Sequence, residues 1–113
     1  MVIRDLSTVK KHLFFCNGDA CKTSGAAETT KVMRQCIKDR GLDKMVHTTK
    51  TLCNGRCYDG PVIMVMPECV YYKEVQAKDC DVFIDKVIGN DTIWTEKLLY
   101  KWGETEVLGK TEP

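Results

Sequence analysis

Two pairs of cysteines, each in a turn-rich loop after a predicted strand, constrain the fold of this 113-residue chain most strongly. The first pair is Cys16-x4-Cys21 and the second is Cys53-x3-Cys57. The carboxyl ends of parallel strands lie at the same end of a sheet, so a parallel arrangement brings both loops together there. The chain is therefore expected to fold so that four thiols converge at one end of the sheet.

The hydrophobic pattern predicts an α/β domain. Extended segments are expected at 11–15, 44–52, 62–66 and 70–75, and amphipathic helices at 24–40 and 79–89. The first helix has Thr23 or Ser24 as its cap and Gly41 as its stop. A last helix after Asn90 or Asp91 would carry Ile93, Trp94, Leu98 and Trp102. A strand-helix-strand unit, a hairpin and a covering helix form a thioredoxin-like skeleton. We predict a central mixed four-stranded sheet flanked by helices, a C-terminal helical extension, and residues 70–75 at the sheet edge.

The length and cysteine count argue against a disulfide scaffold. A chain of 113 residues buries enough surface to fold without cross-links, and its seven cysteines are an odd number. Clustered cysteines in the reducing cytoplasm, the compartment that we expect, more often bind metal or do redox chemistry.

Charge and hydropathy exclude two kinds of partner. The net charge of +1 predicts no nucleic-acid partner, and the longest apolar runs, such as 62–66, are too short to span a membrane. The charges are unevenly distributed, because residues 28–50 hold six basic side chains against three acidic ones. Residues 68–85 hold five acidic side chains against two basic ones, and that side could meet a basic redox partner.

The four loop cysteines are the ligand set that either a [2Fe-2S] cluster or a structural zinc ion requires. Zinc sites usually have tighter spacing in smaller domains, so zinc is the alternative. The chain has no Cys-x-x-Cys motif for thiol exchange, and His12 and His47 precede the loops in predicted strands. Cys36 and Cys80 fall on apolar helix stripes and are expected in the core, whereas Cys69 is interpreted as a non-ligand thiol.

The residues around these cysteines resemble the thioredoxin-like [2Fe-2S] ferredoxins. The resemblance rests on the segments 12–16, 53–65 and 66–72 and extends over about residues 9–90. The resemblance implies that residues 1–113 form a single domain, with a core at about 9–90 and a C-terminal extension at 91–113. Within the family, the chain is most similar to the Shethna-type ferredoxins of nitrogen-fixing bacteria. Cys69 stands where many members have a turn glycine.

The resemblance implies a function and a site. The cluster ligands fall on Cys16, Cys21, Cys53 and Cys57, with one [2Fe-2S] cluster per chain. The protein would be a low-potential one-electron carrier rather than an enzyme, exchanging electrons with a reductase and an acceptor in nitrogenase- or hydrogenase-related metabolism. Family members of this length are commonly homodimers, and residues 70–75 and the Trp94/Trp102 helix would be the surfaces involved. The fold also suggests a cis peptide bond before Pro61. A zinc-stabilised interaction module on the same scaffold is the alternative.

Overall fold

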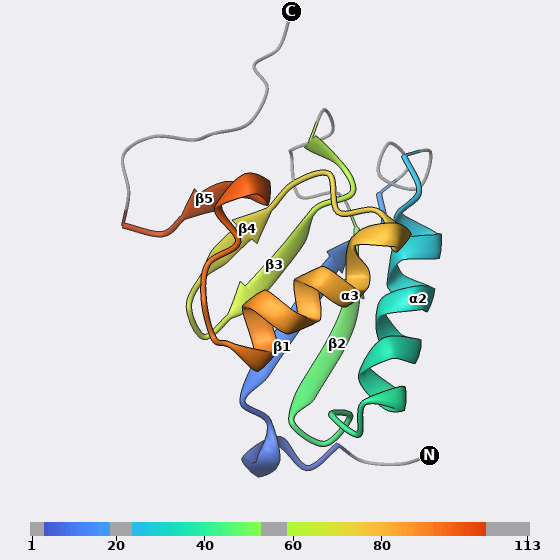
Figure 1. Ribbon diagram of the computed structural model, residues 1–113, viewed down its shortest axis with the longest axis vertical. Helices are drawn as coiled ribbons and strands as arrows, with labels where there is room; N and C mark the ends of the chain where they lie inside the picture. Colours follow the sequence, from blue (N-terminus) through green and yellow to red (C-terminus); the bar gives the residue numbers. More distant parts are fainter. Residues whose placement is uncertain (1–3, 19–23, 53–58, 104–113) are drawn as a thin grey trace, which may run out of the picture.

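A computed structural model describes residues 4–18, 24–52 and 59–103 of the protein (Figure 1). The five strands are β1 (Lys11–Cys16), β2 (Val46–Thr51), β3 (Ile63–Met66), β4 (Val70–Tyr72) and β5 (Leu98–Lys101). They form one mixed sheet in the order β2-β1-β3-β4-β5, in which only β1 and β2 are parallel within the described residues. In the described part of the chain, no helix is long and apolar enough to cross a membrane.

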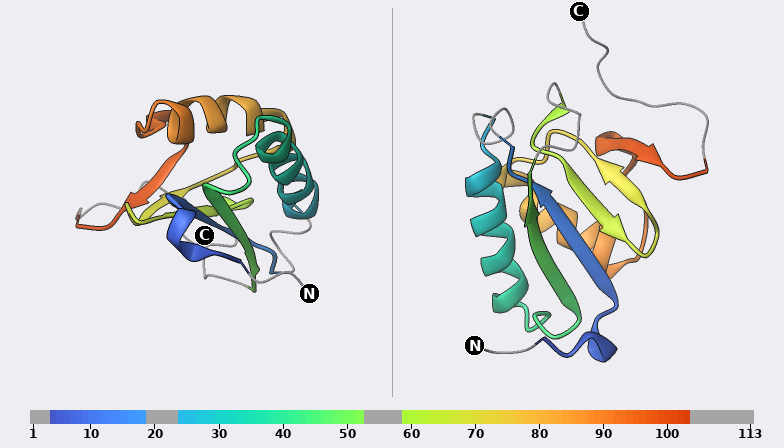
Figure 2. Two further views of the ribbon diagram at one scale, coloured as in Figure 1. Left: turned by 90° about the horizontal axis from the view of Figure 1, so that it is seen from below. Right: turned by 180° about the vertical axis from the view of Figure 1, so that it is seen from behind.

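The helices lie on one face of the sheet (Figure 2). Helix α2 (Ala26–Asp39) connects β1 to β2, and a second helical segment runs through η3 (Ala77–Asp79), α3 (Cys80–Phe83) and η4 (Ile84–Gly89). Short 3₁₀ turns, η1 (Leu6–Thr8) and η5 (Thr95–Lys97), precede β1 and β5. The predicted α/β, thioredoxin-like arrangement of a mixed sheet and helices is confirmed.

The alternation of side chains along the strands divides the core into two clusters. The larger cluster fills the space between the sheet and the helices and includes Leu13, Phe15 and Phe83. The smaller one includes Cys16, Val62, Met64 and Leu99, with Phe14, Tyr71 and Tyr100 packed against it. Cys16 therefore belongs to a different cluster from the helix-facing residues Leu13 and Phe15 of the same strand.

The predicted C-terminal helix is wrong, because a fifth strand stands in its place. In a helix, Trp94, Leu98 and Trp102 would share one face. In the structure Trp94 is buried in the larger cluster, whereas Trp102 is exposed and stacks on Tyr71 of β4 with ring centroids 5.0 Å apart. Pairing β5 with β4 gives the backbone groups along the outer side of β4 hydrogen-bond partners, which a helix would leave unpaired. Within the described residues the sheet consequently has five strands, and β5 rather than β4 lies at its edge.

The start of α2 also differs from the expectation. Its N-cap is Gly25 rather than Ser24, with a φ angle of +106°. Glycine adopts this left-handed backbone readily, and a Cβ atom at this position would lie 2.9 Å from Oε1 of Gln76. The preference for a side-chain N-cap such as Ser24 is therefore outweighed by the close approach of Gln76, which precedes η3 and leaves room only for glycine at position 25.

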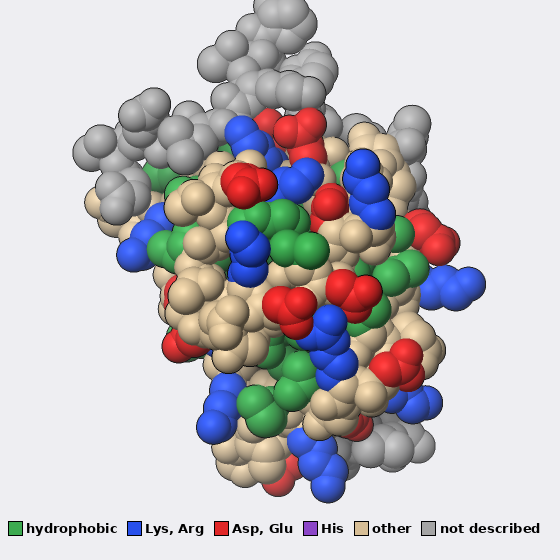
Figure 3. All heavy atoms as spheres, viewed as in Figure 1, with side chains coloured by type: hydrophobic (Ala, Val, Ile, Leu, Met, Phe, Trp, Pro, Cys, Tyr) green, Lys and Arg blue, Asp and Glu red, His purple; other side chains and the backbone are tan. Residues whose placement is uncertain are grey.

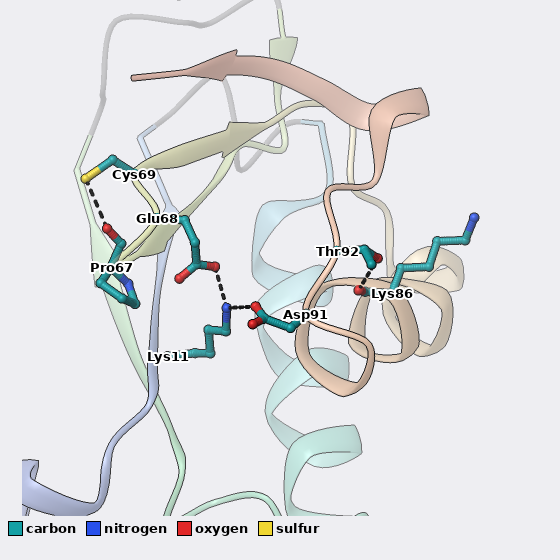
Figure 4. Close-up of polar contacts among 7 residues, drawn as sticks. All are labelled: Lys11, Pro67, Glu68, Cys69, Lys86, Asp91 and Thr92. Atoms are coloured by element: carbon teal, nitrogen blue, oxygen red, sulfur yellow. Dashed lines mark hydrogen bonds and ion pairs between the residues drawn. The ribbon is translucent and has the colours of Figure 1, made fainter. Parts of the chain in front are cut away.

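The start of β1 is connected to the turns after β3 and η4 by an ion-pair network (Figure 4). Nζ of Lys11 lies 2.5 Å from a carboxylate oxygen of Glu68 and 2.5 Å from one of Asp91. Partial burial lowers the pKa of Lys11, but the hydrogen bonds and charges of both carboxylates outweigh it and raise the pKa overall. The network lies at the start of β1, whereas Cys16 is the last residue of that strand.

Candidate metal centre

Cys16 is the one member of the expected ligand set that lies within the described residues. It ends β1, is only 2% exposed, and is aligned in the parallel register with Thr51, the last residue of β2. Cys21, Cys53 and Cys57 lie at 19–23 and 53–58, outside the described residues. The parallel register confirms that the two cysteine segments follow strands whose carboxyl ends lie at the same end of the sheet.

The surroundings of Cys16 include both flanks of the second cysteine segment. Its Sγ atom donates to the backbone carbonyl of Leu52, 3.5 Å away, and Leu52 directly precedes Cys53. The backbone N–H of Cys16 donates to the carbonyl of Val62 over 3.1 Å. Between these two contacts the chain runs through residues 53–61, which contain the second cysteine pair. The predicted cis peptide between Gly60 and Pro61 is present in this stretch.

Asn17 stabilises the end of β1, and the sequence analysis did not identify this role. Its side-chain amide donates to the carbonyl of Phe15 at 3.1 Å and to Oγ1 of Thr30 at 3.3 Å. Its backbone N–H donates to the carbonyl of Thr51 at 2.8 Å. The residue after Cys16 therefore connects β1, β2 and the N-terminal part of α2. One feature of the sequence points to this role: a polar residue directly follows a candidate ligand at the end of a predicted strand.

The other described cysteines lie away from Cys16. Cys80 is fully buried in the helix-facing cluster and Cys36 packs against that cluster, as predicted. Burial raises the pKa of Cys80 to about 12, which keeps it a protonated core thiol. Burial, reinforced by the hydrogen bond to Asp81, also raises the pKa of Cys36. Cys69 lies in the β3–β4 turn, with its Sγ atom 3.5 Å from the carbonyl of Pro67 (Figure 4). That turn follows Met66, which pairs with His12 near the start of β1, so Cys69 and Cys16 lie at opposite ends of the sheet.

The two histidines also lie away from the candidate centre. His12 and His47 are partners in the β1–β2 register, four residues before Cys16 and Thr51, and their ring centroids are 4.5 Å apart. Partial burial, together with the positive charge of Arg4, lowers the pKa of both rings. They are half-buried strand residues, as expected.

The arrangement defines a class of protein. A mixed sheet whose two parallel strands both lead into cysteine segments, with a buried thiol at the end of the first, is suited to a protein that holds a metal or cluster through thiolates. A cysteine in an apolar setting provides the soft sulfur ligand that iron–sulfur clusters use. The described part of the centre therefore fits an iron–sulfur cluster.

Comparisons with known proteins identify the family. A Priestia megaterium protein named, provisionally, a 2Fe-2S ferredoxin is 35% identical over 100 residues, covering 88% of this chain and 78% of that protein. The 2Fe-2S ferredoxin of Aquifex aeolicus is 31% identical over 85 residues, covering 67% of this chain and 77% of the relative. The structure of a thioredoxin-like [2Fe-2S] ferredoxin from Aquifex aeolicus matches with a TM-score of 0.80 and 25% identity, covering 85% of this chain and 96% of that one. No protein-family model matches the chain.

The chain belongs to the thioredoxin-like [2Fe-2S] ferredoxins. It is an electron-transfer protein rather than an enzyme, and it carries a [2Fe-2S] cluster. The family relationship thus decides for the cluster over the zinc alternative.

Proposed function

We propose that Cys16, Cys21, Cys53 and Cys57 bind the cluster, one per chain, and that the protein carries single electrons at low potential. The observation that supports this ligand set is the double contact of Cys16 with the second cysteine segment. Its thiol contacts Leu52 before that segment, and its N–H contacts Val62 after it. Holding both flanks of this segment beside Cys16 shortens the loop that must close when four ligands assemble, which lowers the entropy cost.

The low potential follows from charge. A cluster with four thiolates is formally about −2 when oxidised and about −3 when reduced, so the added electron meets like charge. A buried ligand such as Cys16 limits the access of water, which would otherwise stabilise the reduced form. The cluster supplies the one-electron chemistry, while the protein determines its exposure and its approach to partners.

Metal analysis and spectroscopy test this assignment. Protein purified without oxygen should contain about two irons and two acid-labile sulfides per chain and give a paramagnetic signal when reduced. One equivalent of zinc in a colourless protein would contradict it.

We further propose that a reductase and an acceptor of nitrogenase- or hydrogenase-related metabolism are the redox partners. This proposal derives from the resemblance to the Shethna-type ferredoxins. Reconstituted electron transfer from reductases to nitrogenase and hydrogenase components, compared with unrelated acceptors, tests it. Equal rates with all acceptors would argue against a dedicated partner.

We also propose that residues 1–113 act as one domain.

We propose in addition that two chains associate through the sheet face that carries the smaller core cluster. Trp102 is 57% exposed beside that cluster. It stacks on Tyr71 and lies edge-on to Tyr100 with ring centroids 4.9 Å apart. Exposed aromatic groups of this kind are typical of protein interfaces.

A further inference from the structure

A basic groove lies between α2 and the edge strand β2. Four cations line it: Lys31, Arg34 and Lys38 from successive turns of α2, and Lys50 from β2. The guanidinium of Arg34 reaches across it, donating from Nε to Oγ1 of Thr48 on β2 over 2.9 Å. No carboxylate occurs among the described residues that line the groove. We refer to these four side chains as the α2–β2 basic groove.

The four groove cations lie together without carboxylate partners among the described residues, whereas some cations elsewhere on the protein are paired. Lys11, Arg40 and Lys97 all form ion pairs with aspartate or glutamate side chains. On the face shown in Figure 3, acidic and basic side chains lie next to one another. Within the described part of the chain, none of the four groove cations forms such a pair. The groove therefore keeps a net positive charge, which Asp43, beside Arg34 and Lys38 in the neighbouring pocket, offsets only in part.

The groove extends to the candidate metal centre. Thr30 lines it and accepts a hydrogen bond from the side chain of Asn17, the residue after Cys16. Lys50 is in register with Phe15, one residue before Cys16. A partner seated in the groove would consequently lie beside the end of the sheet from which both cysteine loops leave.

We infer that the α2–β2 basic groove is the docking site for an acidic surface of a redox protein. The inference rests on the proposed cluster position, because an electron carrier gains from a docking site next to its cluster. Four unpaired cations attract carboxylates over a Debye length, and they favour the orientation that brings the cysteine end of the sheet to the partner. The acidic side at 68–85 is less suited to the basic partner expected from the sequence, because Asp79, Asp81 and Asp85 already pair with Lys97 and Arg40.

A carboxylate surface fits the groove better than a nucleic acid does. Proteins that bind single strands combine cations with aromatic rings on which bases stack. The uncharged side chains that line this groove belong to Ala27, Thr30 and Gln35, so the described lining has no stacking platform.

Two charge-matched variants of the cluster-loaded protein test the inference. Lys31→Glu/Lys38→Glu reverses two cations of the groove, and Lys78→Glu/Lys86→Glu reverses two exposed cations of the other helical segment. Both change the net charge equally, and all four positions are exposed, so both proteins should fold. Iron and sulfide content and the visible spectrum are measured first, and they should match the wild type in both variants. Loss of cluster from the wild type itself would count against the proposed function and not against the groove.

Binding of a fluorescein-labelled deca-glutamate peptide gives the first readout. The groove variant should bind roughly tenfold more weakly than wild type at low salt, with a shallower salt dependence, while the control changes less than about twofold. Equal weakening in both variants would overturn the inference. So would a single-stranded oligonucleotide of similar charge that binds the groove more tightly than the peptide does.

Voltammetry at gold coated with carboxylate-terminated monolayers gives the second readout. Electron transfer should be fast for wild type and control and roughly tenfold slower for the groove variant, because the groove orients the cluster end toward the negative surface. Transfer that is faster at amine-terminated gold, or unchanged in the groove variant, would contradict the inference.

Discussion

The Sγ atom of Cys16 donates to the backbone carbonyl of Leu52 over 3.5 Å, and Leu52 immediately precedes Cys53. Cys16 and Leu52, which are 36 residues apart in sequence, are therefore neighbours at the ends of β1 and β2. This relationship joins the first proposed ligand to the residue at which the second cysteine segment begins.

Replacing Cys16 with alanine should abolish stable cluster binding, because alanine provides no ligand atom. Iron and sulfide content should fall at least severalfold relative to wild type. The matched control is Cys36→Ala, which removes a half-buried thiol on the helix side and should leave the cluster content unchanged. A Cys16→Ala protein with a full cluster would contradict the ligand assignment.

Replacing Asn17 with alanine should destabilise the protein by about 1–3 kcal/mol, because the carbonyl of Phe15 and the hydroxyl of Thr30 each lose a buried hydrogen bond. Urea unfolding measures the change. Gln35→Ala is the control, since that exposed amide bonds only to Asp39 in the described structure and should contribute less than about 0.5 kcal/mol. Similar losses in both variants would show that Asn17 has no special role at the strand end.

Burial raises the pKa of Cys80 from 9.0 to about 12, and this difference predicts how the stability of the protein depends on pH. The unfolded chain loses the Cys80 proton at a lower pH than the folded chain does. The contribution of this group to the free energy of unfolding is therefore complete below about pH 9 and falls as the pH rises toward about 12. Cys80→Ala should lose less stability than wild type over this interval in denaturant titrations. Parallel losses would contradict the assignment.

Replacing Cys69 with glycine should stabilise the β3–β4 turn. Cys69 has a φ angle of +58°, a left-handed conformation that costs a residue with a Cβ atom about 1 kcal/mol relative to glycine. Cys69→Gly should therefore raise the urea midpoint, whereas Cys69→Ala removes the thiol but keeps the Cβ atom and should not. If both variants raise the midpoint equally, the thiol and not the backbone is responsible.

A charge at Trp102 should separate the proposed dimer. Trp102→Glu places a carboxylate beside Tyr71 and Tyr100, and sedimentation equilibrium should then show a monomer. Val82→Glu, at an exposed apolar position on α3, should remain dimeric. A dimer in both variants would place the interface elsewhere.

Local sequence patterns were sufficient for much of the fold. The apolar run at 13–15 and the Thr- and Val-rich segment at 44–52 predicted β1 and β2, and the helical spacing around Met33 and Ile37 predicted α2. The C-terminal segment was mispredicted because Trp94, Leu98 and Trp102 fit a helical spacing as well as they fit a strand with a preceding turn. The ambiguity is resolved by the hydrogen bonding of this segment to the outer side of β4, which no local pattern reveals.

The residues alone indicate the two cysteine pairs, the extended segments that precede them and the first helix, because periodicity and turn residues act over short distances. The parallel pairing of β1 with β2, the fifth strand, the role of Asn17 and the basic groove emerge only in the folded chain. Each of these depends on segments far apart in the chain: β1 on β2, β5 on β4, Asn17 on Thr30 and Thr51, and Lys50 on the cations of α2. Long-range hydrogen bonding and packing select such pairings, and a sequence read residue by residue does not contain their geometry.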